Sequence, residues 1–254
     1  MSTDRFSSRH IGPREHEIPE MLKVIGVNSL EELIDKAVPE SIRLRHPLRL
    51  PDAMSEIEYL NHLRRIGARN KIYRSFIGQG YYGVAPLSVI VRNVLENPAW
   101  YTSYTPYQAE ISQGRLEALL NFQTMVVDLT GMQIANASLL DEATAAAEAM
   151  IMMFNARSRE AVKNGANKFF VDNDVFLQTL DVVETRSKPL GIELIKGEYS
   201  DAVFDGSYFG ALIQYPSASG KIRDYKVFTD RAHKSGLLVG VAADLMSLAI
   251  LTPP

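Results

Sequence analysis

Lys168-Phe169-Phe170-Val171-Asp172 opens a series of short apolar runs that decides the fold of this chain. The series continues with the strand-like runs Ile192 to Lys196, Tyr208 to Pro216 and Leu237 to Leu245, and with helical patterns near Val175 to Lys188 and Asp224 to Ser235. Strands that alternate with helices predict a mostly parallel sheet covered by helices on both faces. Gly191 and Gly236 stand where glycine ordinarily ends a helix, so we expect both helices to end there.

Ligands of parallel sheets bind beyond the carboxyl ends of the strands, and three loops are expected at such positions. They are Asn136 to Asp141, Asp172 to Asp174, and Pro216 to Gly220. Asp172-Asn173-Asp174 contains residue types that ordinarily serve turns and helix caps, and we favour that interpretation over a carboxylate pair. Ser217 to Lys221 resembles a phosphate-binding loop, but the early glycine is missing and Ile222 replaces the residue that would bind magnesium.

A helix rich in small residues precedes these strands, after a short expected strand from Met132 to Ala137. Ser138 and Asp141 fit a capping box at its start. Asp141 and Glu142 would repel a phosphate from N–H groups that otherwise attract anions. We therefore expect this helix start not to hold a phosphorylated cofactor. Asp244, at the end of the last strand, could hold a protonated ring nitrogen of a cofactor or cap the following turn.

The polar, aromatic stretch from Ser103 to Gly114 joins a loop-rich region to the α/β pattern. Ser112 is a good N-cap for a helix that continues to Gly131 with a broad apolar face. Polar side chains on a loop beside a rigid scaffold are typical of binding or catalytic sites. A loop with a proline and an exposed tyrosine is also an ordinary turn, so both interpretations stay open.

Gly78-Gln79-Gly80-Tyr81-Tyr82-Gly83 has the glycine spacing of a dinucleotide-binding motif. That motif requires a buried strand before it and an acidic residue about 20 positions later. Here a charged segment, Lys71 to Arg74, precedes the glycines, and Glu96 falls inside an expected helix from Pro86 to Asn97. We favour a tight loop whose glycines adopt conformations that other residues avoid. Its two tyrosines would face a ligand or simply pack.

The preceding residues are expected to form a helical arm. Pro13 stands where a first helical position would be. Ser29 with Glu32, and Ser55 with Glu58, match capping boxes that open two further helices. We therefore divide the chain into an arm, 1–75, and an α/β domain, 76–254.

Composition excludes several classes of function. The 254 residues are 46% hydrophobic, which suffices for a sizeable core. The net charge of -3 lacks the basic excess of nucleic-acid or anionic-membrane binders. Cysteine is absent and the five histidines share no metal-ligand spacing, so we expect no disulfide, no cysteine nucleophile and no metal site. No signal peptide or membrane span is apparent, which favours the cytoplasm.

The run from Tyr104 to Met150, with Phe76 to Tyr82 before it, closely resembles the N-terminal half of glycine dehydrogenase (decarboxylating), the P-protein of the glycine cleavage system. The similarity extends from Arg9-His10-Ile11-Gly12 to the last residue. It implies an incomplete large domain of the aspartate-aminotransferase-like fold (fold type I), with pyridoxal phosphate as the cofactor. In this family glycine loses its carboxylate as carbon dioxide, and the aminomethyl group passes to the lipoyl group of the H-protein.

The resemblance also implies that this chain works with a companion. The Schiff-base lysine of the family lies in the C-terminal half or in a companion subunit, and no lysine follows Asp244 here. We therefore expect an N-terminal fragment with no catalytic residue of its own, inactive alone and not binding the cofactor. The implied partners are the C-terminal half or companion subunit, lipoylated H-protein and glycine, within a homo- or hetero-oligomer. A eukaryotic member would work in the mitochondrial matrix.

The resemblance assigns a group of residues to the lining of a catalytic cleft shared between the halves. They are Gly80, Tyr81 and Tyr82 in the first loop, Tyr104, Thr105, Pro106, Tyr107, Gln108, Glu110, Ser112 and Gln113 in the second, and Gln214, Tyr215 and Pro216. Two other hypotheses remain: a non-catalytic assembly module of the same fold, and a nucleotide-binding domain that uses Gly78 to Gly83.

Overall fold

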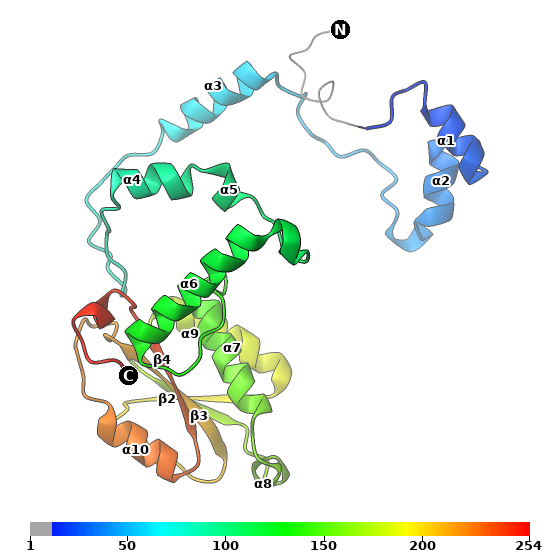
Figure 1. The fold of residues 1–254 in the computed structure, drawn as a ribbon. Helices are drawn as coiled ribbons and strands as arrows, with labels where there is room; N and C mark the ends of the chain where they lie inside the picture. Colours follow the sequence, from blue (N-terminus) through cyan, green and yellow to red (C-terminus); the bar gives the residue numbers. More distant parts are fainter. Residues whose placement is uncertain (1–11) are drawn as a thin grey trace. The chain divides into compact units, whose positions relative to one another are not determined.

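The computed structural model describes residues 12–254 (Figure 1). The chain divides into two compact units, Met1–Ser75 and Phe76–Pro254. Arg9, His10 and Ile11, which contribute to the resemblance, lie outside the described residues.

Four parallel strands form the sheet of the second unit. They are β1 (Lys168–Asp172), β2 (Glu193–Gly197), β3 (Tyr208–Tyr215) and β4 (Leu238–Ala243), in the order β2-β1-β3-β4. Phe169 lies opposite Leu194 of β2, and Ala211 lies opposite Val239 of β4. The predicted parallel sheet is thus confirmed. Because the chain crosses β1 after leaving β2, the loops that follow β1 and β3 lie next to each other at the carboxyl edge.

Helices cover both faces of the sheet (Figure 1). α7 (Glu142–Asn155) and α9 (Leu177–Ser187) pack on one face, and α10 (Lys226–Lys234) packs on the other. Neighbouring residues of β1 point to opposite faces, so Phe169 packs with Met150 of α7 while Phe170 packs with Phe228 of α10. Burial on both faces explains why the run reads as continuously apolar. Gly191 and Gly236 follow these helices with φ of 66° and 77°, as predicted.

The strand expected at residues 132–137, just before the sheet, is absent from the structure. α6 (Gln113–Thr130) ends at Gly131 as predicted, with φ of 68°, but Met132 to Ala137 is not a strand. The Ala135 carbonyl accepts a hydrogen bond from Gln123 Nε2 of α6 at 3.0 Å, so the segment is held by a helix side chain rather than by a strand.

α7 also begins later than the sequence suggests. Its N-cap is Asp141, whose Oδ1 accepts a hydrogen bond from the Thr144 N–H at 2.6 Å, whereas Ser138 lies before the cap. A carboxylate at the positive end of the helix dipole combines the hydrogen bond with a charge interaction, which explains why Asp141 takes this position.

The region before α6 contains short helical pieces rather than the single helix expected from Pro86 to Asn97. The pieces are α4 (Ser88–Ile90), a π-helical turn (Val91–Leu95), α5 (Pro98–Tyr101) and a 3-10 turn (Ala109–Ile111). The Glu96 N–H binds the carbonyl of Val91, five residues back, at 3.0 Å. Asn97 then starts α5, because its Oδ1 caps the Ala99 N–H at 3.0 Å.

The rest of the second unit contains three further short helical pieces, which are α8 (Arg159–Lys163) and the 3-10 turns Lys188–Leu190 and Ser247–Ala249.

The first unit contains α1 (Ile18–Ile25), α2 (Leu30–Ala37), a 3-10 turn (Glu40–Ile42) and α3 (Glu56–Gly67). Ser55 and Glu58 form the predicted capping box, with Ser55 Oγ accepting at 3.3 Å and Glu58 Oε2 accepting at 2.8 Å. At α2, Ser29 caps the helix, but Glu32 accepts from the Asn28 N–H instead. Pro13 does not start α1, because that helix begins at Ile18.

Candidate functional site

The two tyrosines of the first loop, Tyr81 and Tyr82, form hydrogen bonds with carboxylates of the second unit. The Tyr81 hydroxyl donates to the carboxylate of Glu142 at the start of α7, and the Tyr82 hydroxyl donates to Asp244 Oδ2 at 2.5 Å. The Tyr81 ring also packs on Phe176, with 5.1 Å between ring centroids. Both phenols are hydrogen-bonded within the chain, and the Tyr81 ring is also packed, whereas the Tyr82 side chain is exposed.

Burial of Tyr81 and its hydrogen bond to Glu142 raise the pKa of this phenol to about 12. The hydrogen bond to Asp244 raises the pKa of Tyr82 above its usual value. Both hydroxyls therefore keep their protons at neutral pH and act as donors. They fasten the loop to the carboxyl side of the sheet, where α7 begins and β4 ends.

Gly80 is required by the shape of this loop. Its φ is 90°, and a Cβ added there would lie 2.2 Å from Phe176 Cε1. Gly78 and Gln79 before it also have positive φ, at 68° and 57°. Within residues 12–254 no strand precedes the loop, so the strand-loop-helix context of a dinucleotide site is absent there.

The Asp244 carboxylate is engaged on both oxygens. Oδ1 accepts from the Met246 N–H at 3.0 Å, and Oδ2 accepts from Tyr82. Of the two roles left open by the sequence, the structure shows the turn cap, together with the unforeseen bond to Tyr82.

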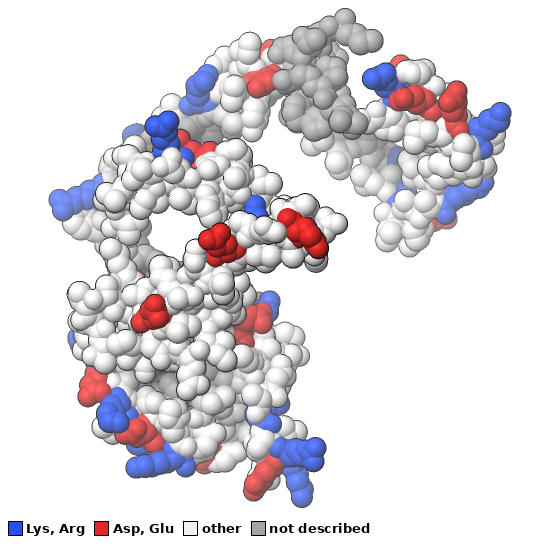
Figure 2. All heavy atoms as spheres, viewed as in Figure 1, with Lys and Arg blue, Asp and Glu red and all other residues white. Residues whose placement is uncertain are grey.

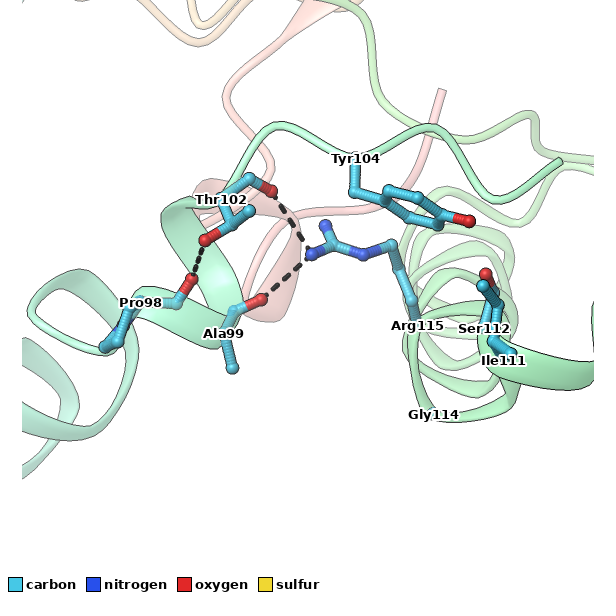
Figure 3. A pocket seen from close by; sticks show the side chains of 8 residues that line it. All are labelled: Pro98, Ala99, Thr102, Tyr104, Ile111, Ser112, Gly114 and Arg115. Atoms are coloured by element: carbon cyan, nitrogen blue, oxygen red, sulfur yellow. Dashed lines mark hydrogen bonds between the residues drawn. The ribbon is translucent and has the colours of Figure 1, made fainter. Parts of the chain in front are cut away.

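The polar stretch from Ser103 to Gly114, called the second stretch below, borders an open hollow of about 650 Å³ (Figure 3). Its lining residues are Pro98, Ala99, Thr102, Tyr104, Ile111, Ser112, Gly114 and Arg115. Arg115 Nη2 donates to the carbonyls of Ala99 at 2.9 Å and Thr102 at 3.2 Å, which ties α6 to α5. Sequence reasoning missed this residue. A basic side chain in the first turn, where the helix dipole disfavours positive charge, was the signal available.

Ser112 occupies the N-cap position of α6, but its side chain makes no capping hydrogen bond. The residue is only 4% exposed, and its Oγ has no hydrogen-bond partner in the chain. The prediction of a side-chain cap is therefore wrong. The backbone ψ of 14° departs from the extended conformation that an N-cap normally adopts, which accounts for the missing bond.

The other predicted site residues lie in two different settings. Thr105, Tyr107, Gln108, Glu110 and Gln113 are exposed and do not line the hollow. Gln214 is buried on β3, where its Nε2 donates to the Ala242 carbonyl at 2.8 Å and its Oε1 has no partner. No hydrogen bond between described residues joins the first loop to the second stretch, so the candidates form separate clusters.

The loops after β1 and β3 are joined by Asp174. Its Oδ2 accepts from Ser219 Oγ and from Arg223 Nη2, each at 2.7 Å. Burial opposes ionisation of Asp174, but these hydrogen bonds outweigh it and lower the pKa. Burial raises the pKa of Asp172, which accepts from the Tyr199 N–H at 2.9 Å. The structural interpretation of Asp172 to Asp174 holds, although Asp174 bridges two loops rather than capping α9.

A sequence profile described as "Glycine cleavage system P-protein" matches residues 8–254. The chain belongs to this family. It is 57% identical over 249 residues to glycine dehydrogenase (decarboxylating) of Nostoc punctiforme, covering 98% of this chain and 25% of that protein. It is 52% identical over 254 residues to the enzyme of the same name from Flavobacterium johnsoniae, covering 100% of this chain and 27% of that protein. The chain thus spans about a quarter of the length of these relatives.

The fold agrees with this membership. A crystal structure of glycine decarboxylase (P-protein) of the glycine cleavage system, in inhibitor-bound form, superposes with a TM-score of 0.77. The sequences are 33% identical, and the match covers 96% of this chain and 55% of that chain. The predicted α/β architecture of fold type I is therefore confirmed for this P-protein family member.

Pyridoxal phosphate, which the P-protein resemblance implies, does not fit the start of α7 or the end of β4. The start of α7 borders a hollow of about 330 Å³, but Asp141 and Glu142 line it. The backbone hydrogen bond from Thr144 lowers the pKa of Asp141, so its negative charge persists at neutral pH and repels phosphate. Asp244, the candidate partner for a ring nitrogen, is occupied by Tyr82 and Met246.

The surface of this P-protein family member shows mixed charge. On the face drawn in Figure 2, acidic and basic side chains of the described residues are interspersed. Among residues 12–254, no helix combines the length and apolarity needed to cross a membrane. In the same residues no three His, Asp or Glu side chains gather as metal ligands would.

Proposed function

We propose that this chain forms one wall of the active-site cleft of a glycine decarboxylase. The Schiff-base lysine and the pyridoxal phosphate site belong to a C-terminal half or companion subunit. The family match over residues 8–254 carries this proposal, because the matched relatives are about four times longer than the chain. The poor fit of the cofactor to Asp141, Glu142 and Asp244 supports it.

The two clusters would contribute differently to such a cleft. The first loop, with Gly80, Tyr81 and Tyr82, is fastened internally, so we assign it a positioning role. The second stretch offers Tyr104 and Ser112 at a hollow. It also carries the exposed side chains of Thr105, Tyr107, Gln108, Glu110 and Gln113, which are available to a companion chain. These residues would orient glycine or the lipoyl arm of the H-protein and exclude water during decarboxylation.

A mixing experiment tests this role. The chain, a lysine-bearing C-terminal half of the enzyme, and their mixture are each incubated with pyridoxal phosphate, lipoylated H-protein and carboxyl-labelled glycine. We expect labelled carbon dioxide only from the mixture, and no borohydride-stable pyridoxyl label on this chain. Labelling and decarboxylation by the chain alone would contradict the proposal.

The same mixture tests the alternative role as an assembly module. Co-purification of the two parts without any activity would favour a non-catalytic function. Isothermal titration with NAD addresses the nucleotide-binding hypothesis, for which we expect no heat.

A further inference from the structure

The start of α6 has backbone donors without a partner inside the helix. α6 is 18 residues long, and the first-turn N–H groups of any helix lack intrahelical acceptors. The N-cap side chain does not accept from them, and no acidic residue stands in the first turn. α7 is different, since Asp141 caps it and Glu142 follows. The positive end of the α6 dipole is therefore left uncompensated.

Ser112 provides a second, independent sign of a missing ligand. Its side chain lines the hollow at the start of α6, yet the residue is 4% exposed and Oγ has no partner. Buried hydroxyls are nearly always hydrogen-bonded, because a buried donor without an acceptor loses its hydrogen bonds to water and gains none in the protein. An acceptor placed in the hollow would satisfy this group.

Arg115 brings a positive charge to the same hollow. Its Nη2 is held by the carbonyls of Ala99 and Thr102, so Nε and Nη1 remain for a ligand (Figure 3). A guanidinium in the first turn opposes the helix dipole unless an anion lies between them. Its planar fork matches the geometry of carboxylates and phosphates.

We propose that the start of α6 is an oxyanion site, formed by the first-turn N–H groups, Ser112 Oγ and Arg115, that takes a carboxylate or phosphate group. Each component donates hydrogen bonds, and together they supply a full positive charge plus the partial charge of the dipole. Glu110, the acidic residue nearest in sequence before the cap, does not line the hollow. The site deepens the proposed function, since it names the anionic group that the hollow beside Ser112 would take, but the observations that carry it are contacts within this chain.

The chain itself carries two probes for the test. Trp100, its single tryptophan, lies in α5 between Ala99 and Thr102, so its fluorescence reports on the hollow. Amide resonances of Gln113, Gly114 and Arg115 report on the first turn. Inorganic phosphate and acetate are titrated separately at constant ionic strength, which distinguishes the two sources of the oxyanion. The amides of Glu142 and Ala143, at the self-capped start of α7, serve as an internal control.

We expect saturable shifts at the first turn of α6 with at least one of the two anions, and none at α7. Ser112→Ala should weaken binding about tenfold, the usual effect of losing one hydrogen bond to a charged group. The helix should persist in this variant because Ser112 makes no capping bond. Arg115→Gln should weaken anion binding at least as much as Ser112→Ala. Arg159→Gln on α8 removes an equal charge elsewhere and should leave anion binding unchanged.

Arg115→Lys separates charge from geometry and should bind between the wild type and Arg115→Gln. Absence of a saturable shift in the wild type, or equal binding by wild type and Ser112→Ala, would overturn the proposal. Failure of the mixing experiment would leave this result untouched, because no companion chain is used.

Discussion

At the scale of single residues, Gly80 makes the sharpest prediction. A Cβ there would lie 2.2 Å from the Phe176 ring, and its φ of 90° is unfavourable for any side chain. Gly80→Ala should therefore lower the free energy of unfolding by about 2–4 kcal/mol, since strain and overpacking add. Urea unfolding measures the change.

Gly83→Ala is the matched control. Nothing lies within 4 Å of its added Cβ and its φ is not positive, so we expect a change within about 1 kcal/mol. The double variant Gly80→Ala/Phe176→Leu should recover only the part due to the clash. An unfolding midpoint for Gly80→Ala equal to that of Gly83→Ala would show that the loop does not hold this conformation.

The Tyr81 phenol predicts a dependence of stability on alkaline pH. Its folded pKa of about 12 exceeds the unfolded value of about 10, so its hydrogen bond stabilises the fold below pH of about 10. That stability is lost as the pH rises through the folded pKa. Tyr81→Phe should cost about 0.5–1.5 kcal/mol at pH 8, and the difference should shrink above pH of about 10.

Tyr107→Phe serves as the comparison. Because Tyr107 is 89% exposed, this substitution should leave the free energy of unfolding unchanged at each pH. Urea unfolding at several pH values provides the measurement. A Tyr81→Phe difference that grows with pH would exclude a donated hydrogen bond to Glu142.

At the scale of elements, Asp174 links the loops after β1 and β3. Its folded pKa is lowered, so it stabilises the fold above the unfolded pKa of about 4 and loses this effect as the pH falls through the folded value. Asp174→Asn should lower the free energy of unfolding by about 1–3 kcal/mol at pH 7. The difference should disappear in acid, where the wild-type carboxyl is protonated.

Asp181→Asn on α9 removes the same charge from an exposed position and should have little effect. Thermal unfolding between pH 3 and pH 7 checks both variants. A cost of Asp174→Asn that persists at pH 3 would assign the loss to packing rather than to the charge.

Elements could be predicted where their determinants are local. Ser55 and Glu58 are three residues apart and their capping box forms as expected, because both partners belong to one helical turn. β1 is predictable because its continuous apolar residues need burial on both faces of a sheet. The strand predicted from Met132 to Ala137 is wrong because a strand requires a partner strand, and Gln123 binds the Ala135 carbonyl instead.

The candidate site depends more on distant contacts, so less of it could be predicted. The glycine requirement at Gly80 follows from local backbone geometry, but its neighbour Phe176 is far along the chain. The bond between Tyr82 and Asp244 spans 162 residues and has no local signal. The hollow borders the start of α6, where Arg115 ties this helix to the short helix α5, an arrangement that no spacing rule reveals.

At the scale of the whole molecule, the edges of the sheet predict self-association. β2 and β4 are the edge strands, and within residues 12–254 no further strand pairs with either. β2 carries Glu193 and Lys196, charges that discourage strand addition, whereas β4 carries none and exposes Leu238 by 50%. We expect concentration-dependent association of the chain through β4.

Light scattering coupled to size exclusion measures this association. Leu238→Lys should reduce it by placing a charge on the edge, whereas Lys226→Arg on α10 should not. A monomer at all concentrations in the wild type would contradict the prediction.

The hydrogen bond between Tyr82 and Asp244 also sets an order of events during synthesis. Its two partners lie 162 residues apart, so the phenol has no acceptor until β4 has joined β3. Because translation proceeds from the N-terminus, Tyr82 emerges from the ribosome long before Asp244. The bond of Tyr82 is therefore among the last contacts of this unit to form, and protease sensitivity of nascent chains at Tyr82 would persist until Asp244 has emerged.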